Sequence, residues 1–365
     1  MKNLSDVVQS TTDFERWAGR HVHLIRSDVT LKHRLMAESP FPFFRATFYR
    51  WAQWWPVICP ELARAPHVLT VGDLHVENFG TWRDVEGRLI WGVNDFDEAW
   101  PAAYTADIVR LLTSAYLAID EDHLAISRKV ARQAIEQGYR DSIAKGGGPF
   151  ILAEHHKWLR LLAVSKLRDP VVFWAKIAAC PKYRGKLPKD VWRLVHGSLP
   201  VRTMSYEVKT RLAGLGSLGH PRVLTLATWD GAHVVREAKQ LTPSAWIWAR
   251  GLASTQILGR KLIESAVRIR DPHVHFAEHW IVRRLAPDCS HIEIQSLPEE
   301  RDEERLVYYM GWEMANIHLG SRKALSTVKR DLGRRKGRWL HKAAKSMLEV
   351  TLDDWKFWRR NASRT

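Results

Sequence analysis

The feature that most constrains the fold is a predicted β-hairpin with acidic and amide side chains at both ends. Residues 79–82 and 88–94 are apolar segments on either side of a polar turn at 84–87. Asp73, His75 and Asn78 precede the first strand, and Asp95 and Asp97 follow the second. Because an antiparallel hairpin returns to its starting point, we predict that Asn78 and Asp95 are neighbours. The hairpin therefore predicts a polar cluster drawn from two separate parts of the sequence.

The chemistry of this cluster favours a hard cation. Carboxylate and amide oxygens suit Mg²⁺, which binds one or two carboxylates and takes water and phosphate as its other ligands. Asn78, Asp95 and Asp97 are the candidate metal-binding residues. Each of them alone could equally be a turn residue that caps a strand or a helix. Their grouping around one hairpin favours the metal site over that interpretation.

The rest of the chain predicts an α+β fold. Helical periodicity follows Pro101, and strand-like alternation returns at 223–228 and 233–238 around a turn at Asp230 and Gly231. The segments 245–270 and 303–365 are again helical in pattern. We divide the chain into a helical large lobe with the hairpin (1–203), a small antiparallel-sheet lobe (204–300) and C-terminal helices that return to the large lobe (301–365).

A glycine-rich segment, GLGSLG at 214–219, is the second candidate site. It is followed by a predicted strand, so it does not have the strand–loop–helix context of a dinucleotide-binding fold. A glycine loop between antiparallel strands can cover nucleotide phosphates with its backbone N–H groups. The alternative is a simple glycine-rich hairpin turn. The candidate nucleotide-binding residues are Gly214, Gly216, Ser217, Gly219 and, on a following strand, Arg236 and Lys239.

The amino-acid composition indicates which partners the protein could bind and in which compartment we expect it. The formal net charge of +16 should attract polyanions such as nucleotides, nucleic acid or acidic lipid. Three widely spaced cysteines argue against a disulfide framework or a thiolate zinc site, so we expect a cytoplasmic protein. The sequence also lacks an apolar run long enough to span a bilayer. A basic run at 329–338 could bind nucleic acid, but a solvated helix face is the favoured interpretation.

These motifs together resemble a known superfamily. Residues 71–78 look like the catalytic loop of aminoglycoside phosphotransferases, a branch of the kinase-like superfamily in which an Asp is followed five positions later by an Asn. Residues 95–99 look like the metal-binding segment of that branch, and 106–112 like the helix that follows it. A closer resemblance, over roughly residues 30–320, is to an uncharacterised bacterial family, number 2252 among the domains of unknown function. Its features are echoed by residues 39–45, 72–80, 94–98 and 214–219.

The resemblance implies a kinase-like two-lobed fold and a phosphotransferase that uses ATP and Mg²⁺. Asp73 would orient or deprotonate an acceptor hydroxyl, and His75 would buttress the catalytic loop by hydrogen bonding. Asn78 and Asp95 would hold Mg²⁺, with Asp97 beside them. In ordinary kinases the glycine loop precedes the catalytic loop, whereas here it follows, so we predict a circular permutation. The segment 309–318 looks like the helix that usually leads into the catalytic loop.

The sequence departs from the family pattern at the small-lobe cation. Arg236 stands where the family has a Lys, and Lys239 could replace it only if the strand bulges, because the two positions otherwise point to opposite faces. Glu264 is a candidate partner for this cation. We expect Asp107 to hold the catalytic loop through hydrogen bonds at a helix start. We expect Glu77 and Glu98 to be solvated.

The sequence is also compatible with other functions. The chain could be a nucleotide-binding pseudokinase or a nucleotidyl transferase. It could also be a metal-dependent phosphoesterase, since residues 72–75 and the Asp-x-His of 271–273 resemble fragments of such sites. A nonenzymatic nucleic-acid-binding protein is the last alternative. The residues do not specify the acceptor or the oligomeric state.

Overall fold

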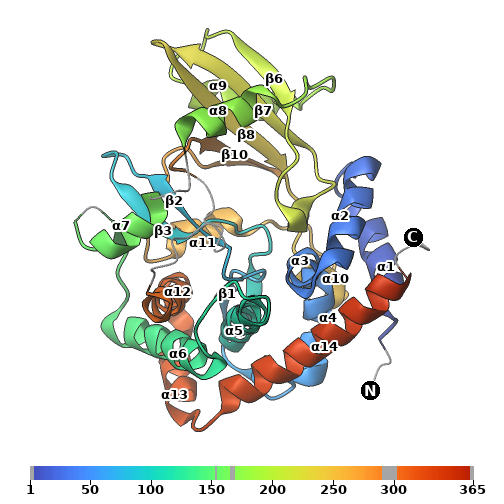
Figure 1. The fold of residues 1–365 in the computed structure, drawn as a ribbon, viewed down its shortest axis with the longest axis vertical. Coiled ribbons are helices and arrows are strands. Elements are labelled where there is room, and N and C mark those ends of the chain that lie inside the picture. The colour runs from blue at the N-terminus through green and yellow to red at the C-terminus, as the bar shows by residue number, and fades with distance from the viewer. Residues whose placement is uncertain (1–3, 153, 165–168, 290–301, 362–365) are drawn as a thin grey trace.

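The computed structural model describes residues 4–152, 154–164, 169–289 and 302–361. It has the α+β architecture that the sequence predicts, with a five-stranded antiparallel sheet above a larger helical part (Figure 1). No helix within the described residues is both long and apolar enough to cross a membrane.

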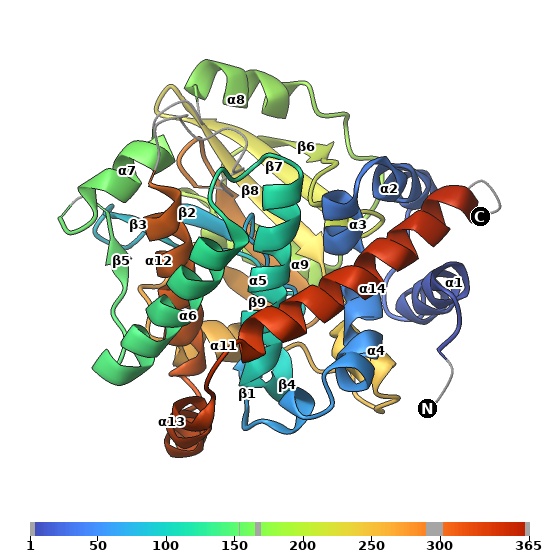
Figure 2. The same ribbon diagram turned by 60° about the horizontal axis from the view of Figure 1, so that its bottom comes forward.

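The chain begins with a layer of four helices that flank residues 71–78, which are named the catalytic-loop segment after the role that the sequence predicts for them. They are α1 (Val7–Ala18), α2 (Arg26–Glu38), α3 (Pro40–Ala46) and α4 (Phe48–Ile58). Asp6 caps α1 by accepting a hydrogen bond from the Gln9 N–H, and Pro40 begins α3, where a missing N–H costs nothing. The last helix, α14 (Trp339–Asn361), crosses beneath this layer and contacts both α1 and α4 (Figure 2).

Two small sheets frame the catalytic-loop segment. β1 (His67–Thr70) pairs antiparallel with β4 (Trp100–Ala103). β2 (Phe79–Arg83) pairs with β3 (Leu89–Val93), which also pairs with β5 (Phe150–Ile151). The β2–β3 hairpin confirms the predicted one, and the Asn94 N–H donates to the Asn78 carbonyl at 3.0 Å, at the open end of the hairpin. The predicted neighbours, Asn78 and Asp95, meet at this end as well, because the Asp95 N–H donates to Asn78 Oδ1 at 2.9 Å.

The helical part is built around α5 (Tyr104–Asp120), which is buried along almost its whole length. A helix with apolar residues on all sides requires packing on all sides, and α5 contacts α14, α6 and β1. The remaining helices of this part are α6 (Arg128–Lys145), α7 (Lys157–Val164), α12 (Glu303–His318) and α13 (Leu325–Arg334). The segment 309–318 is thus helical, as predicted.

The five-stranded sheet has the order β6-β7-β8-β10-β9. Its strands are β6 (Tyr206–Thr210), β7 (Arg222–Trp229), β8 (Ala232–Gln240), β9 (His275–Ala277) and β10 (Trp280–Leu285). Asp230 and Gly231 form the predicted β7–β8 turn with positive φ angles of 47° and 81°. β8 pairs in continuous register with β7 and β10, so it contains no bulge.

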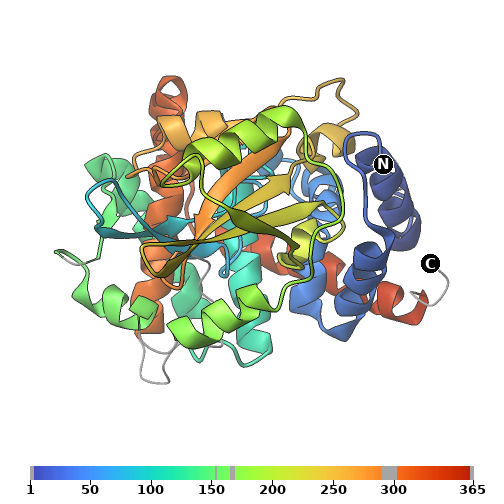
Figure 3. The ribbon, with the colours of Figure 1, turned by 90° about the horizontal axis from the view of Figure 1, so that it is seen from above.

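Two helices that the sequence interpretation groups with the large lobe pack instead against this sheet. α9 (Lys189–Ser198) buries Val191 and Val195 against Val223 and Ala238, and α8 (Pro170–Ala178) buries Ile177 against the sheet (Figure 3). The predicted helical stretch 245–270 is wrong in its middle. It forms only α10 (Ala245–Ala249) and α11 (Gly259–Ser265), because Gly251, with φ of 63°, follows the end of α10 in the left-handed conformation.

Candidate active site

The catalytic-loop segment 71–78 is fixed by one buried carboxylate. Asp107, in the first turn of α5, accepts hydrogen bonds from the backbone N–H groups of Val71 (2.7 Å) and Gly72 (3.1 Å). His318, at the end of α12, places Nε2 3.0 Å from Asp107 Oδ2, and both side chains are fully buried. The prediction that Asp107 holds this loop from a helix start is confirmed.

Gly72 is required by the same loop. Its φ angle is 84°, and an added Cβ would lie 2.4 Å from the carbonyl oxygen of Glu98. A side chain could therefore not be accommodated where the loop passes the segment that follows β3. The close approach brings residue 73 beside residues 95–98.

Asp73 is held by a buried arginine. Arg110 Nε lies 3.0 Å from Asp73 Oδ1, and the Arg110 side chain is 0% exposed. The same guanidinium donates to the Phe44 carbonyl at 3.0 Å and stacks 3.9 Å from the centre of the Phe44 ring. Burial raises the pKa of Asp73, and the positive charge of Arg110 opposes that rise. Sequence reasoning missed Arg110, although a charged residue inside the apolar stretch 108–112 signals a buried ion pair.

The predicted Asn–Asp cluster is present at the open end of the hairpin. Asn78 Nδ2 donates to the Asp73 carbonyl at 2.9 Å, and Asn78 Oδ1 accepts from the Asp95 N–H at 2.9 Å. Asp95 Oδ1 accepts from the Asp97 N–H at 3.3 Å. One amide thus ties the catalytic-loop segment to the acidic segment 95–97. Burial and the charge of Asp95 raise the pKa of Asp97 to about 7.

Lys239 of β8, in the five-stranded sheet, is a cation that reaches this cluster. Its ammonium lies 2.5 Å from Asp97 Oδ2 and 3.5 Å from Asp95 Oδ2, and its side chain is 2% exposed. Glu264, which the sequence left as either a partner of the cation or a surface residue, is exposed and takes no part in this contact. The acidic segment of the hairpin supplies the counter-charge instead.

The prediction that Arg236 faces the cleft is wrong. Arg236 Nε donates to the Ser198 carbonyl at 2.8 Å, on the sheet face that α9 covers. Because β8 is regular, residues 237 and 239 share the opposite face, and Lys239 reaches the acidic cluster without a bulge. The resemblance to kinase-like proteins aligned their lysine with Arg236, which lies on the face of β8 that α9 covers.

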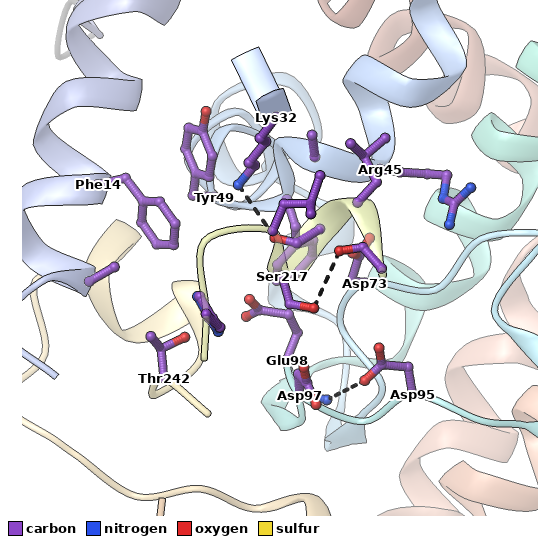
Figure 4. Close-up of a pocket in the computed structure, with 18 of the residues that line it drawn as sticks. Phe14, Lys32, Arg45, Tyr49, Asp73, Asp95, Asp97, Glu98, Ser217 and Thr242 are labelled. Carbon is purple, nitrogen blue, oxygen red and sulfur yellow. Dashed lines mark hydrogen bonds between the residues drawn. The ribbon is translucent and has the colours of Figure 1, made fainter. Parts of the chain in front are cut away.

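The glycine segment lies directly over Asp73 (Figure 4). A Cβ on Gly216 would lie 3.1 Å from the Arg45 carbonyl and 3.5 Å from Asp73 Oδ2. Gly214 has a φ of 74°, and residues Leu215–Ser217 form a short 3-10 turn. The segment joins β6 to β7, two adjacent antiparallel strands, as the sequence predicts.

Side chains that sequence reasoning missed hold the glycine segment in place. Lys32 of α2, 5% exposed, donates to the Gly216 carbonyl at 3.4 Å, and Arg222 of β7 donates to Ser217 Oγ at 2.9 Å. The Ile25 N–H donates to the Gly219 carbonyl at 2.8 Å. Nothing local in the sequence connects residues of α2 with the glycine segment, so only the tertiary structure could reveal these contacts.

His75 and Glu77 of the loop, and Glu98 of the segment that follows β3, are not solvent-exposed side chains. His75 accepts from the Glu77 N–H at 3.2 Å through Nδ1, a contact within the loop. Glu77 pairs with Arg45, and Glu98 Oε2 accepts from the Ala245 N–H (2.6 Å) and from Ser244 Oγ (2.9 Å). The expectation that Glu77 and Glu98 are solvated is therefore wrong. Burial raises the pKa of Glu98 to about 8.

Two cavities flank the glycine segment. One is lined by Lys32, Tyr49, Asp73, Asn78 and Glu98 together with residues 214–218. The second has a volume of about 700 Å³ and is lined by residues from the α2–α3 junction, the catalytic-loop segment and the five-stranded sheet. Asp95, Glu77 and Arg45 line both cavities, so the two spaces meet at the acidic cluster.

The side chains of the acidic cluster can be compared with the ligands that a metal ion requires. No group of three or more His, Cys, Asp or Glu side chains in the described part of the chain could hold a metal by itself. Mg²⁺ needs only one or two carboxylates when phosphate oxygens complete its coordination, and Asp95, Asp97 and Asn78 fit that requirement.

Part of the chain is similar to a described family. Residues 24–169 match the model of a family described as an uncharacterized protein conserved in bacteria (DUF2252). The matched segment contains Asp73, Asn78, Asp95, Asp97 and Asp107, and it ends before the glycine segment. No curated protein and no solved structure is significantly similar to the chain.

Proposed function

We propose that the chain is an ATP- and Mg²⁺-dependent phosphotransferase with a kinase-like, circularly permuted two-lobed fold, acting on a hydroxyl acceptor. The observation that carries the proposal is the convergence of three separate segments. Gly216 lies over Asp73, Asn78 joins Asp73 to Asp95, and Lys239 joins Asp95 and Asp97 to the five-stranded sheet. A base, metal ligands, a glycine loop and a cation are the minimum that phosphoryl transfer requires.

Each group has a role in this proposal. Asp73 orients the acceptor hydroxyl and accepts its proton, and Arg110 fixes the direction of the Asp73 carboxylate. Lys239 and the N–H groups of the glycine segment neutralise charge on the transferred phosphoryl group. Asn78, Asp95 and Asp97 would hold Mg²⁺, which when bound supplies further neutralisation of the phosphate charge.

The permuted order has physical support. α1 and α14, which lie near the two ends of the chain, contact each other in the same layer of the large lobe (Figure 1). Chain termini that lie close together permit a different starting point without a change in the packed structure. α12 follows the five-stranded sheet in sequence. Its His318 contacts Asp107, which holds the catalytic-loop segment, so the C-terminal helices would complete the large lobe of the proposed fold.

Thermal-shift titration tests nucleotide binding first. ATP with Mg²⁺ should raise the melting temperature, because a ligand that binds only the folded state stabilises it. Consumption of ATP in the presence of a library of hydroxylated metabolites then tests transfer. Asp73→Asn should abolish transfer and keep ATP binding, whereas Asp95→Asn should weaken the Mg²⁺-dependent part of binding. Asp120→Asn, at the far end of α5, is the control.

The outcomes separate this function from its alternatives. Full transfer activity in both Asp73→Asn and Asp95→Asn would refute the site assignment. ATP binding without consumption for any acceptor would favour a nucleotide-binding protein without transfer activity. Release of pyrophosphate in place of ADP would identify a nucleotidyl transferase.

A further inference from the structure

The cavity of about 700 Å³ beside the glycine segment is large enough for a nucleotide, but its lining is charged. Pockets that bind a planar base are mostly apolar, with a few polar groups that fix orientation. Here the apolar side chains among the described lining residues are Phe41, Pro42 and Ala213. The charged and polar lining residues are Glu38, Ser39, Arg45, Glu77, Asp95, Glu121, His123, Arg211, Arg222 and Arg283.

Three arginines that line this cavity all pair with one buried glutamate. Glu237 of β8 is 0% exposed, and its carboxylate contacts Arg211 at 2.5 Å, Arg222 at 2.7 Å and Arg283 at 2.9 Å. Burial opposes ionisation of Glu237, but the three guanidinium groups hold its pKa well below the usual range. Three positive charges and one negative charge leave a surplus of positive charge at the face of the sheet that lines the cavity.

This surplus is directed toward the cavity. The side chains of Arg211 and Arg283 are 25% and 13% exposed, and both line the cavity. On the opposite wall, Arg45 pairs with Glu77 through Nη1, and its buried Nε has no hydrogen-bond partner among the described residues. Arginine forks bind phosphate oxygens with two donors each, so this arrangement suits several phosphate groups.

The same cavity also has carboxylates in its lining. Asp95 lines the same cavity, next to Asp97 and Asn78. A ligand that contacts both the arginines and Asp95 needs negative groups for the first and a cation for the second. A Mg²⁺-bound polyphosphate meets both conditions, whereas a nucleoside base meets neither.

We propose that the arginine-lined cavity binds the phosphate chain of the phosphoryl donor, so that the donor is selected by its phosphates and its cation and not by its base. This inference rests on the proposed phosphotransferase function and names the chemical class of its donor. Nucleoside triphosphates and inorganic polyphosphate share that chemistry. Arg211, Arg222 and Arg283 grip the chain from the sheet, and Arg45 does so from α3.

Isothermal titration of the full chain separates these donors. With Mg²⁺ present, we expect tripolyphosphate to bind within about tenfold of ATP, ATP and GTP to bind within about threefold of each other, and adenosine to give no signal at millimolar concentration. Arg211→Gln should weaken ATP and tripolyphosphate binding by the same factor, about tenfold or more. Glu237 keeps Arg222 and Arg283 in this variant, so the sheet should remain folded. Arg202→Gln, an exposed position outside the cavity, is the matched control.

Each result has a distinct meaning. Binding of ATP about a hundredfold or more tighter than tripolyphosphate, or competition by adenosine, would overturn this inference and leave the phosphotransferase proposal standing. Tripolyphosphate binding that is insensitive to Arg211→Gln would overturn the assignment of the cavity. Arg211-dependent tripolyphosphate binding without phosphoryl transfer to any acceptor would overturn the proposed function and leave the donor site standing. If neither donor binds, both proposals are wrong.

Discussion

Arg110 Nε lies 3.0 Å from Asp73 Oδ1, and this ion pair joins the centre of the most buried helix to the residue proposed as the base. The guanidinium is fully buried among the rings of Phe44, Phe48 and Trp51, and its Nη1 has no hydrogen-bond partner among the described residues. Asp73 is therefore its main counter-charge. The direction of the Asp73 carboxylate and the packing of the large lobe depend on the same contact.

Arg110→Met removes the charge, whereas the methionine side chain fills most of the volume of the arginine. This variant should destabilise the protein. Removing one partner of a buried ion pair costs about 3–5 kcal/mol, because the other charge loses its compensation. Urea denaturation should show this loss in the free energy of unfolding. Arg128→Met is the matched control, since Arg128 pairs with Asp120 at the surface and such pairs contribute at most about 1 kcal/mol. Equal stability of the two variants would show that the Arg110–Asp73 pair does not support the fold.

Asp107 should be more important for stability than its position on a helix suggests. It accepts two backbone hydrogen bonds from the catalytic-loop segment and contacts His318, and Asp107→Ala leaves all three groups unpaired in the interior. Each buried donor without a partner costs about 1–3 kcal/mol. We expect Asp107→Ala to lower the melting temperature strongly and Asp120→Ala, in the same helix, to change it little. The reverse order of the two variants would contradict the role given to Asp107.

The sequence predicts the elements near the site better than it predicts their contacts. The β2–β3 hairpin, the turn at Asp230 and Gly231 and the proximity of Asn78 to Asp95 follow from local rules, because turn residues and strand alternation act over short distances. The position of Gly216 over Asp73 follows only from the resemblance to kinase-like proteins. The buried arginines could not be assigned partners, since their carboxylates lie far away in the sequence.

The local sequence did not predict correctly which face of β8 meets the cleft. A strand alternates its side chains with a period of two, so the choice between Arg236 and Lys239 is a choice of which face meets the cleft. Local sequence does not determine that face, because both faces of β8 carry buried charged residues, Arg236 on one and Glu237 on the other. α9 covers the Arg236 face, whereas on the opposite face α8 packs near Val235 and Lys239, four residues further along β8, reaches the acidic cluster.

Mg²⁺ affinity should depend on pH through Asp97. In an unfolded chain an aspartate loses its proton near pH 4, whereas burial and the neighbouring Asp95 raise the pKa of Asp97 in the folded protein to about 7. The folded state therefore holds this proton more tightly, so this residue adds stability as the pH falls from about 7 toward 4, and its ionisation is unfavourable above that range. Mg²⁺ must displace the proton, so its affinity should fall about tenfold per pH unit below 7 and level off above it.

Calorimetric titration with MgCl₂ and ATP at about pH 6 and about pH 8 measures this effect. Asp97→Asn should bind Mg²⁺ more weakly at the higher pH and lose most of the pH dependence. Asp120→Asn should behave like the unchanged protein. A pH dependence that persists in Asp97→Asn would assign the titration to another group, and Glu98, with a pKa of about 8, would be the next to replace by Gln.

Lys239→Met and Arg236→Lys together test which face of β8 serves the site. Lys239 contacts Asp97 and Asp95 in the cleft, whereas Arg236 contacts the Ser198 carbonyl behind the sheet. Loss of a preorganised charge that acts on the transferred group lowers the turnover rate by about a hundredfold to a thousandfold, so Lys239→Met should show a loss of that size. Arg236→Lys keeps a donor for Ser198 and should retain nearly full turnover. ATP turnover by both variants, with their melting temperatures measured in parallel, gives the answer: a large loss in Arg236→Lys at unchanged stability would return the cation's role to Arg236.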